Sequence, residues 1–311
     1  MKKLSSKDLI SINLLSADEV KLIIEESNEI KNGPRNIDVL NGKTLAMIFE
    51  KSSTRTRVSF EAGMYQLGGL GMYFSSRDLQ IGRGETIHDT AKVLSRYVNG
   101  IMARTFSYQT ILDLAKYASV PVINGLTDYD HPCQILADLF TIYEKKGKLK
   151  GLNLTYLGDG NNVLHSLIQG CVKVGMNITY ASPGGYKPLD SVVEEARKFA
   201  QTTGSVIKAT DDPVDAVKEA DIIYTDVWVS MGQEEEKQKR LNDLKRYQLN
   251  SVLLGKGKKD ALVMHCLPAH RGEEITDEVI DGPNSIVFDE AENRLHTQKA
   301  IILTLLGLAK R

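Results

Sequence analysis

Apolar segments alternate with amphipathic segments along most of the chain, and this alternation constrains the fold more than any other feature. The apolar segments have the length of strands, and the segments between them repeat apolar residues at helical spacing. Ser16 and Glu19, for example, form the S-x-x-E pattern that starts a helix. Strands that alternate with helices predict parallel sheets covered by helices on both faces, and 311 residues allow two such domains.

A Lys- and Gly-rich stretch, Lys145 to Gly151, divides the predicted strands into two groups. The first group is Thr44–Phe49, Gly71–Phe74, Gly100–Ala103 and Val120–Asn124. The second group is Leu152–Leu157, Asn177–Ala181, Ser205–Ala209, Asp221–Thr225, Ala261–His265 and Ser285–Phe288. We therefore expect one domain over residues 1–147 and a second over 148–288. Residues 289–311 are predicted as a C-terminal helix that returns to the first domain.

Composition excludes several classes of protein. The formal net charge is −1, and no cluster of basic residues is large enough to suggest a nucleic-acid partner. No stretch has the length and apolarity of a membrane span. Three widely spaced cysteines argue against a disulfide framework and a zinc site, and they favour a reducing, cytoplasmic location.

The stretch from Phe49 to Arg57 follows a predicted strand and runs into a predicted helix. Such a junction presents free backbone N–H groups and the positive end of a helix dipole, which together bind anions. Ser53 and Thr54 are good N-cap residues, and Arg55 adds a guanidinium group that can bind phosphate through two hydrogen bonds. The stretch therefore predicts a phosphate-bearing small substrate. The alternative is an ordinary capped helix with solvated arginines.

Polar clusters follow several other predicted strands. They are Arg104-Thr105 and the stretches from Asp128 to Gln134, from Gly158 to Asn162, from Asp226 to Gly232 and from His265 to Pro268. Ligands of doubly wound sheets bind beyond the carboxyl ends of the strands. Because each cluster lies at such an end, we expect these residues to form a substrate site.

Each cluster also has a simpler interpretation. The stretch from Gly158 to Asn162 is similar to a dinucleotide fingerprint, but Val163 stands where the third glycine is needed. His131 either caps a helix or polarises a carbonyl group as a neutral donor. Cys266 is either a small buried hydrophobe or a thiol activated by the preceding histidine. Asp226 is either a cap or the counter-ion of an amine.

Four of these stretches carry a family resemblance. Ser53-Thr54-Arg55-Thr56-Arg57 and His131-Pro132-Cys133-Gln134 are similar to the carbamoyl-phosphate signatures of the aspartate/ornithine carbamoyltransferases. Asp226-Val227-Trp228-Val229-Ser230-Met231-Gly232 and His265-Cys266-Leu267-Pro268 resemble the ornithine-specific members in particular. The similarity extends in order from about Ser16 to the last helix. It implies two doubly wound parallel-sheet domains joined by helices, assembled as a homotrimer.

The resemblance implies a role for each matching residue on the carbamoyl-phosphate side. The phosphate would be held by Ser53, Thr54, Arg55 and Thr56. Arg104 would bridge the phosphate and the carbonyl oxygen, and His131 and Arg294 would also polarise that carbonyl. Gln134 would bind the carbamoyl amide. Gln80 matches a residue that family members contribute to a neighbouring subunit, so that active sites are shared.

On the amino-acid side, the resemblance implies that ornithine is held through its α-amino and α-carboxylate groups by Asn162, Asp226, Ser230 and Met231. Cys266 and Leu267 would face its δ-amine. The implied reaction is attack of the neutral δ-amine on the carbamoyl carbon, which gives L-citrulline and phosphate through a tetrahedral intermediate. It would need no cofactor, metal or covalent enzyme intermediate, and its catalytic residues would be Arg104, His131, Cys266 and Arg294.

The residues are compatible with this chemistry, since several donors stand where negative charge grows. Either a thiolate at Cys266 or the substrate phosphate would accept the δ-ammonium proton. The alternatives are a sibling transferase acting on putrescine or an acylated ornithine, a Rossmann oxidoreductase, and a non-catalytic binding protein on the same scaffold. A role in arginine synthesis or in arginine degradation, and any assembly of trimers, stay open.

Overall fold

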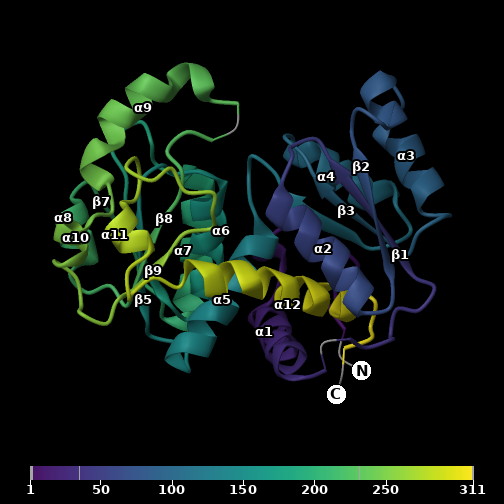
Figure 1. Ribbon diagram of the computed structural model, residues 1–311, viewed down its shortest axis with the longest axis horizontal. Coiled ribbons are helices and arrows are strands. Elements are labelled where there is room, and N and C mark those ends of the chain that lie inside the picture. The colour runs from purple at the N-terminus through teal and green to yellow at the C-terminus, as the bar shows by residue number, and fades with distance from the viewer. Residues whose placement is uncertain (1–2, 35, 231, 310–311) are drawn as a thin grey trace. The chain divides into compact units, whose positions relative to one another are not determined.

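The computed structural model describes residues 3–34, 36–230 and 232–309. The chain divides into two compact units, each with one parallel sheet (Figure 1). Unit 1 is Met1–Phe140 with Glu292–Arg311, and unit 2 is Thr141–Ala291. Both boundaries fall inside helices, α5 (Pro132–Lys146) and α12 (Val287–Leu305), so continuous helical backbone joins the units. The predicted fold class, two parallel-sheet α/β domains joined by helices, is confirmed.

The sheet of unit 1 has the strand order β2-β1-β3-β4, with all pairs parallel. Its strands are β1 (Thr44–Phe49), β2 (Leu70–Ser75), β3 (Gly100–Arg104) and β4 (Val122–Leu126). The helices are α1 (Ala17–Asn32), α2 (Thr54–Gln66), α3 (Ile87–Leu94) and α4 (Tyr108–Tyr117), with the 3-10 helices η1 (Ile12–Leu14) and η2 (Gln80–Arg83).

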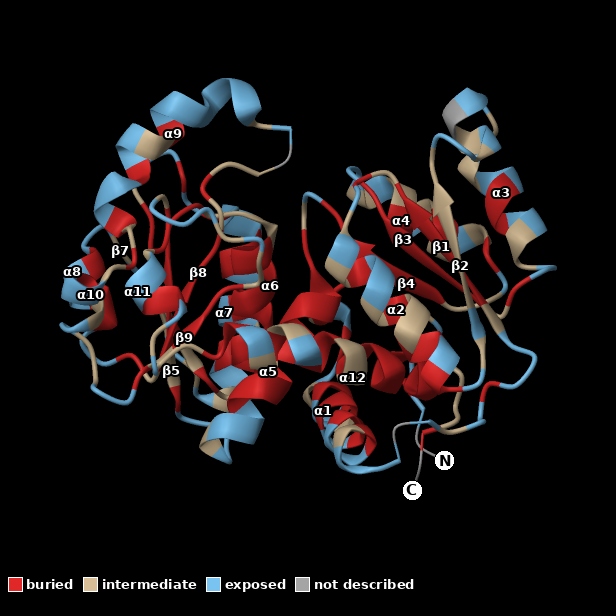
Figure 2. Ribbon diagram, viewed as in Figure 1, coloured by how far each residue is buried: buried red, intermediate tan, exposed pale blue. Residues whose placement is uncertain are grey.

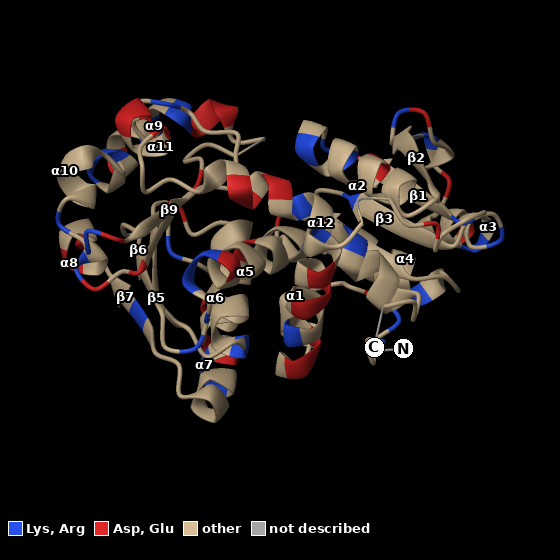
Figure 3. Ribbon diagram, turned by 60° about the horizontal axis from the view of Figure 1, so that its bottom comes forward, with Lys and Arg blue, Asp and Glu red and all other residues tan. Residues whose placement is uncertain are grey.

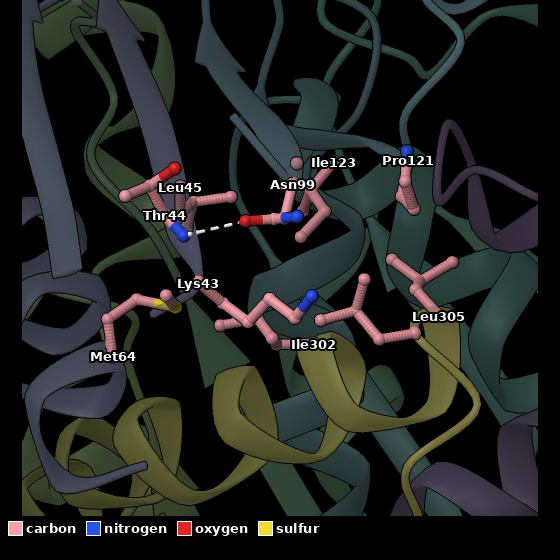
Figure 4. A pocket seen from close by; sticks show the side chains of 11 residues that line it. Lys43, Thr44, Leu45, Met64, Asn99, Pro121, Ile123, Ile302 and Leu305 are labelled. Carbon is pink, nitrogen blue, oxygen red and sulfur yellow. Dashed lines mark hydrogen bonds between the residues drawn. The ribbon is translucent and has the colours of Figure 1, made fainter. Parts of the chain in front are cut away.

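Helices cover both faces of this sheet, because strand side chains alternate between the faces. Ala46 and Ile48 pack in a cluster with Ile111 of α4. The neighbouring Leu45 lines a small apolar recess on the other face, together with Ile302 of α12 (Figure 4). α12 also lies beside α1 and α2 (Figure 1). The C-terminal helix therefore packs back on the first unit, as predicted.

The sheet of unit 2 has the order β7-β6-β5-β8-β9, again with all pairs parallel. Its strands are β5 (Asn153–Leu157), β6 (Asn177–Ala181), β7 (Ile207–Thr210), β8 (Ile222–Thr225) and β9 (Leu262–Met264). The helices are α6 (Asn162–Lys173), α7 (Asp190–Thr203), α8 (Pro213–Val217), α9 (Lys237–Leu244), α10 (Ser251–Leu254) and α11 (Asp277–Ile280), with the 3-10 helices η3 (Glu234–Glu236) and η4 (Lys245–Tyr247).

One strand prediction in unit 2 is wrong. The segment Ser285–Phe288 is not a strand, because Ser285 makes only an isolated bridge with Val263 and helix α12 begins at Val287. Val287 is buried and Phe288 is exposed. An amphipathic helix start and a short strand share this pattern of one buried and one exposed residue, so the pattern does not distinguish them.

Burial follows the layers. All residues of β3, β4 and β8 are buried, whereas the edge strand β2 is half-exposed and α9 presents much of its surface (Figure 2). In the described part of the chain, no helix combines the length and the apolar composition that a membrane span requires.

Each sheet has a switch point, at which successive connections leave in opposite directions along the sheet. In unit 1 this point lies between β1 and β3, and in unit 2 it lies between β5 and β8. Ligands of open α/β sheets bind beyond the carboxyl ends of the strands at such points. The apolar recess of Figure 4 includes Thr44 and Gly100, which lie at the amino ends of β1 and β3. It is therefore at the opposite end of these strands from the carboxyl ends, where ligands bind.

Candidate active site

The switch point of unit 1 carries the Ser/Thr/Arg stretch recognised in the sequence. β1 ends at Phe49, and α2 begins five residues later with Ser53 as its N-cap. The hydroxyl oxygen of Ser53 accepts a hydrogen bond of 3.2 Å from the backbone N–H of Thr56. The other N–H groups of this first turn point away from the helix body and present positive charge to an anion. Arg55 is half-buried in the same turn.

Two buried arginines converge on Thr56 from different parts of unit 1. Arg104 is the last residue of β3 and lies 3.5 Å from the Thr56 hydroxyl through Nη1. Arg294 of α12 reaches the same hydroxyl through Nη2 at 3.1 Å and the Oε1 atom of Gln134 through Nη1 at 2.6 Å. Gln134 is in turn held by Asp138, one turn further along α5, at 2.8 Å. The arginines belong to a network that sets their direction before any ligand binds.

His131 stands directly before α5, where its carbonyl oxygen accepts hydrogen bonds from the N–H groups of Gln134 and Ile135. The side chain is 4 % exposed. Burial lowers the pKa of His131 well below its usual value, and the positive charges of Arg294, Arg104 and Arg55 lower it further. The imidazole is therefore neutral at physiological pH and can donate one hydrogen bond without adding charge.

Another buried cation lies just before the first turn of α2. Lys51 is buried, forms an ion pair with Asp128 and lies 4.5 Å from the centre of the Phe106 ring. Basic residues are also visible on α2 and α12 in Figure 3. The predicted residues Ser53, Thr56, Arg104, His131, Gln134 and Arg294 all belong to unit 1, and the contacts above connect most of them.

Gln80 is placed differently. It begins η2 and is exposed, and its side chain makes no hydrogen bond to any described residue. Nothing in its own unit therefore holds it against Arg104, His131 or Arg294.

The switch point of unit 2 centres on Asp226, which follows β8 and is 4 % exposed. Its Oδ2 atom accepts a hydrogen bond of 2.7 Å from the Asn161 amide, and its Oδ1 atom accepts one of 3.1 Å from the Cys266 thiol. Asn161 is also the N-cap of α6, where its Oδ1 atom accepts from the N–H groups of Val163 and Leu164. The carboxylate is thus fixed between the loops that follow β5 and β9.

A buried histidine shapes the turn that carries Cys266. The Nδ1 atom of His265 accepts from the N–H of Leu267 at 2.9 Å, and its Nε2 atom lies 3.1 Å from Oε1 of Glu274. Leu267 has φ +57°, a left-handed conformation that is unusual for a leucine, and the Leu267–Pro268 peptide is cis. Both ring nitrogens of His265 are thus engaged, by Leu267 and by Glu274, and activation of the Cys266 thiol by this histidine stays a prediction.

The hydrogen bonds of His265 also decide whether this turn can bind a metal. Asp226, His265 and Cys266 offer ligand-type atoms within 4.8 Å of one another. A histidine ligand needs a lone pair on one ring nitrogen, but Nδ1 of His265 already accepts from Leu267 and Nε2 bonds Glu274. The donor set therefore does not fit a metal without breaking this network.

The remaining predicted residues of unit 2 lie near Asp226 in the chain or the fold. Ser230 is half-buried, and its N–H donates to the Gln233 side chain at 3.1 Å. Asn162 is half-buried as the first residue of α6. Met231 lies outside the described residues. Arg240 of α9 anchors the segment that follows, because it donates to Asp159 at 2.9 Å and to the carbonyl oxygen of Trp228 at 3.2 Å.

Sequence reasoning missed three participants. Asn161 bonds Asp226, and its position before a helix was a signal for a cap. Glu274, which orients His265, lies nine residues from it in the chain, and Arg240, which holds Asp159, lies 81 residues from its partner. No local pattern marks either of them.

Known proteins share this architecture. The family model described as aspartate/ornithine carbamoyltransferase, carbamoyl-P binding domain, matches residues 7–144. The model described as aspartate/ornithine carbamoyltransferase, Asp/Orn binding domain, matches residues 150–305. An ornithine carbamoyltransferase of Bacillus subtilis is 57 % identical over 303 residues, which cover 97 % of this chain and 95 % of the relative.

Solved structures agree with the sequence comparison. An ornithine carbamoyltransferase from Pyrococcus furiosus superposes with a TM-score of 0.93 at 52 % identity, covering 97 % of this chain and 98 % of that one. One from Gloeobacter violaceus superposes with a TM-score of 0.88 at 45 % identity over the whole of both chains.

Proposed function

The chain belongs to the aspartate/ornithine carbamoyltransferase family, and on this premise we propose that it transfers the carbamoyl group of carbamoyl phosphate to the δ-amine of L-ornithine. The products are L-citrulline and phosphate. The observation that carries the proposal is the convergence of Arg104 and Arg294 on Thr56 at the amino end of α2. This arrangement offers fixed cationic donors and a helix dipole to a dianion, which is the charge of a phosphate leaving group.

In the proposed mechanism, unit 1 binds carbamoyl phosphate. The phosphate lies on the first turn of α2, where the donors are Ser53, Thr54, Arg55 and Thr56. Arg104, His131 and Arg294 direct hydrogen bonds to the carbonyl oxygen. Charge on that oxygen grows as the amine attacks, so donors that are already oriented stabilise the tetrahedral intermediate more than the substrate. The neutral state of His131 suits this role, because a neutral donor does not compete for the phosphate.

Gln134 is proposed to recognise the carbamoyl amide. Its Oε1 atom already accepts from Arg294, and a carbonyl oxygen has a second lone pair for an N–H of the substrate. The NH₂ group of the Gln134 side chain donates to Asp138, so the orientation of the side-chain amide is fixed.

Unit 2 is proposed to bind L-ornithine. Asp226 would pair with the α-ammonium group, and Asn162, Ser230 and Met231 would complete the recognition of the α-amino acid. Cys266 and Leu267 would face the δ-amine. The left-handed backbone at Leu267 supports this role, because strained conformations are held at sites where a backbone group must be aimed.

The reaction needs no covalent enzyme intermediate, because the amine is itself the nucleophile. The δ-ammonium group must first lose a proton. The Cys266 thiol donates a hydrogen bond to Asp226. In this arrangement the substrate phosphate is the better acceptor of the δ-ammonium proton.

The active unit is proposed to be a homotrimer in which Gln80 completes the site of a neighbouring subunit. The exposed side chain of Gln80, which bonds no described residue, supports this arrangement. A reducing, cytoplasmic location is supported by the three cysteines, all within the described residues, none of which forms a disulfide.

Citrulline formation tests the function. Purified protein would be supplied with carbamoyl phosphate and, in parallel, with L-ornithine, putrescine, N-acetyl-L-ornithine and L-aspartate. We expect carbamoylation of L-ornithine and release of one phosphate for each citrulline. Equal or greater turnover with putrescine or the acetylated amine would assign the chain to a sibling transferase, and no turnover with any amine would reject the proposal.

A further inference from the structure

Asp130, the residue before His131, is buried completely in unit 1. Its Oδ1 atom accepts hydrogen bonds from the Asn124 amide at 2.6 Å and from the Thr127 hydroxyl at 3.2 Å. A third donor is the hydroxyl of Ser11. The proposed mechanism uses none of these four residues. A carboxyl group with this many specific partners, in a position where an apolar side chain would avoid the cost of burial, requires an explanation.

The first connection of Asp130 is to the start of the chain. Residues 8–11 lie beside β4 as a short parallel extension of the sheet, which we call the edge segment. Leu9 donates to the carbonyl oxygen of Val122 and accepts from the N–H of Asn124, at 2.9 and 2.8 Å. The Asn124 amide donates both to Ile10 in this segment, at 2.8 Å, and to Asp130. Asp130 and Asn124 therefore tie the edge segment to the loop that follows β4.

The second connection is to His131. The backbone of Asp130 closes a turn with Thr127, whose N–H donates to the carbonyl oxygen of Asp130 at 2.9 Å. The N–H of Asp130 returns a hydrogen bond of 3.2 Å to the Thr127 hydroxyl. The next residue, His131, caps α5 with its carbonyl oxygen. Rotation of the Asp130 peptide would therefore turn the His131 side chain away from Arg104 and Arg294.

Asp130 is buried among neutral hydrogen-bond donors. Its three partners, Ser11, Asn124 and Thr127, are neutral donors, and no ion pair joins its carboxyl group to a cation within the described residues. Burial raises the pKa of Asp130 to about 7, against the effect of these hydrogen bonds. The titratable groups that follow on the same loop and helix are His131, which is neutral, and Cys133, whose pKa burial raises to about 12.

We propose that Asp130 is a positioning residue that holds His131 in the carbamoyl-phosphate site and links that site to the edge segment. The inference rests on the proposed function, since it assumes that His131 donates to the carbamoyl group. It goes beyond that function because it assigns a role to the edge segment, which contributes no residue to the site.

The test compares the full-length wild type with Asp130→Asn, Asp130→Ala and Ser11→Ala. Asparagine is the closest isostere of an uncharged aspartic acid, and alanine removes all three hydrogen bonds. Asp8→Asn is the matched control, because Asp8 lies in the edge segment and accepts from the N–H of Val122 but does not contact Asp130. For each protein, KM for carbamoyl phosphate, KM for L-ornithine and kcat would be measured at pH 6 and pH 8, with the melting temperature.

At pH 6 we expect Asp130→Ala to lower kcat/KM for carbamoyl phosphate by about tenfold to a hundredfold, because small misplacements of a catalytic group have effects of this size. KM for L-ornithine should change little. Asp130→Asn and Asp8→Asn should stay within about threefold of wild type, less than half of a tenfold step in barrier height.

Several outcomes would overturn the inference. A loss shared equally between the two substrates, together with a lower melting temperature, would mean that Asp130 only stabilises the fold. An asparagine variant as impaired as the alanine variant at pH 6 would mean that an acceptor oxygen at residue 130 does not position His131. If Asp130→Ala does not fold, Ser11→Ala decides, and wild-type values for it would reject the link. A wild type that forms no citrulline would instead reject the proposed function.

Discussion

Arg294 and Gln134 are joined by a hydrogen bond of 2.6 Å between Nη1 and Oε1, although 160 residues separate them in the chain. The second amino group of the same guanidinium reaches Thr56 at 3.1 Å. Helix α12 thus returns a buried cation to the turns where α2 and α5 begin. Because two hydrogen bonds already hold this planar guanidinium, it loses little further conformational freedom when a ligand binds. It can therefore act as a positive charge in a fixed position.

Replacement of Arg294 by lysine separates its charge from its geometry. Lysine keeps the positive charge but cannot bond Gln134 and Thr56 together through one rigid group. We expect Arg294→Lys to lower kcat for citrulline formation by about a hundredfold, the usual effect of one lost oxyanion donor. The matched control is Arg96→Lys, because Arg96 is exposed in unit 1. A kcat near the wild-type value would show that only the charge of Arg294 matters.

Asp226 should govern recognition of the amino acid. Asp226→Asn removes the counter-ion of the α-ammonium group. It also places a second side-chain amide against the Asn161 amide, which donates to Asp226 in the wild type. We expect KM for L-ornithine to rise by about tenfold to a hundredfold, because a hydrogen bond to a charged group contributes roughly 1.5–3 kcal/mol. KM for carbamoyl phosphate should change far less. Asp215→Asn, at an exposed position of α8, is the control, and similar increases for both substrates would make Asp226 structural.

The Cys266 thiol donates to Asp226, so we expect it to orient the substrate rather than to accept a proton. A serine hydroxyl can make the same bond, whereas alanine cannot. Activity should rise with pH as the δ-ammonium group loses its proton, and Cys266→Ser should keep the midpoint of this rise. Cys266→Ala should raise KM for L-ornithine without moving the midpoint. A shift of about one pH unit in the serine variant would identify Cys266 as the proton acceptor.

Arg240 should stabilise unit 2 in a pH-dependent way. Burial raises the pKa of Asp159 to about 6 even beside the Arg240 guanidinium. Because this folded-state pKa lies above the usual value of 3.8, the contribution of Asp159 to stability falls as pH rises between these values. Arg240→Gln removes the counter-ion and should raise the pKa further.

The variant should therefore be destabilised most where Asp159 is ionised. We expect a loss of about 3 kcal/mol at pH 8, which is the scale for breaking a buried ion pair, and a smaller loss at pH 5. Urea unfolding at both pH values measures the difference. The control is Arg246→Gln, whose side chain is 60 % exposed. A loss that is equal at pH 5 and pH 8 would contradict the assigned role of Asp159.

Complementation between subunits tests the shared site. One variant would lack the Gln80 loop and the other would carry Arg55→Ala, and each should be inactive alone. In mixed trimers, some sites would combine an intact Arg55 with an intact Gln80 from a neighbour. Unfolding and reassembly of the mixture should restore part of the activity. Reassembled hybrids that stay inactive, when wild-type controls recover, would reject sharing.

The local chemistry of the sequence was enough to predict most elements and the location of the site. The strand predicted at Thr44–Phe49 has the same bounds as β1, and the capping box of Ser16 and Glu19 is present. The polar clusters after β1, β3, β5 and β8 were predicted to form a site because each lies at the carboxyl end of a predicted strand. These features depend on residues a few positions apart, and spacing over such distances is visible in the sequence.

The pairing of distant side chains was decided only by tertiary structure. Asn161 meets Asp226, Glu274 holds His265, and Asp130 joins the edge segment to His131. The start of α12 at Val287, where a strand was predicted, belongs to the same class. Each of these outcomes depends on how separate elements pack against one another, and some of these elements are far apart in the chain, as Asn161 and Asp226 are at a separation of 65 residues. Local propensity differs by too little to choose among them, and burial of the whole unit selects the partners.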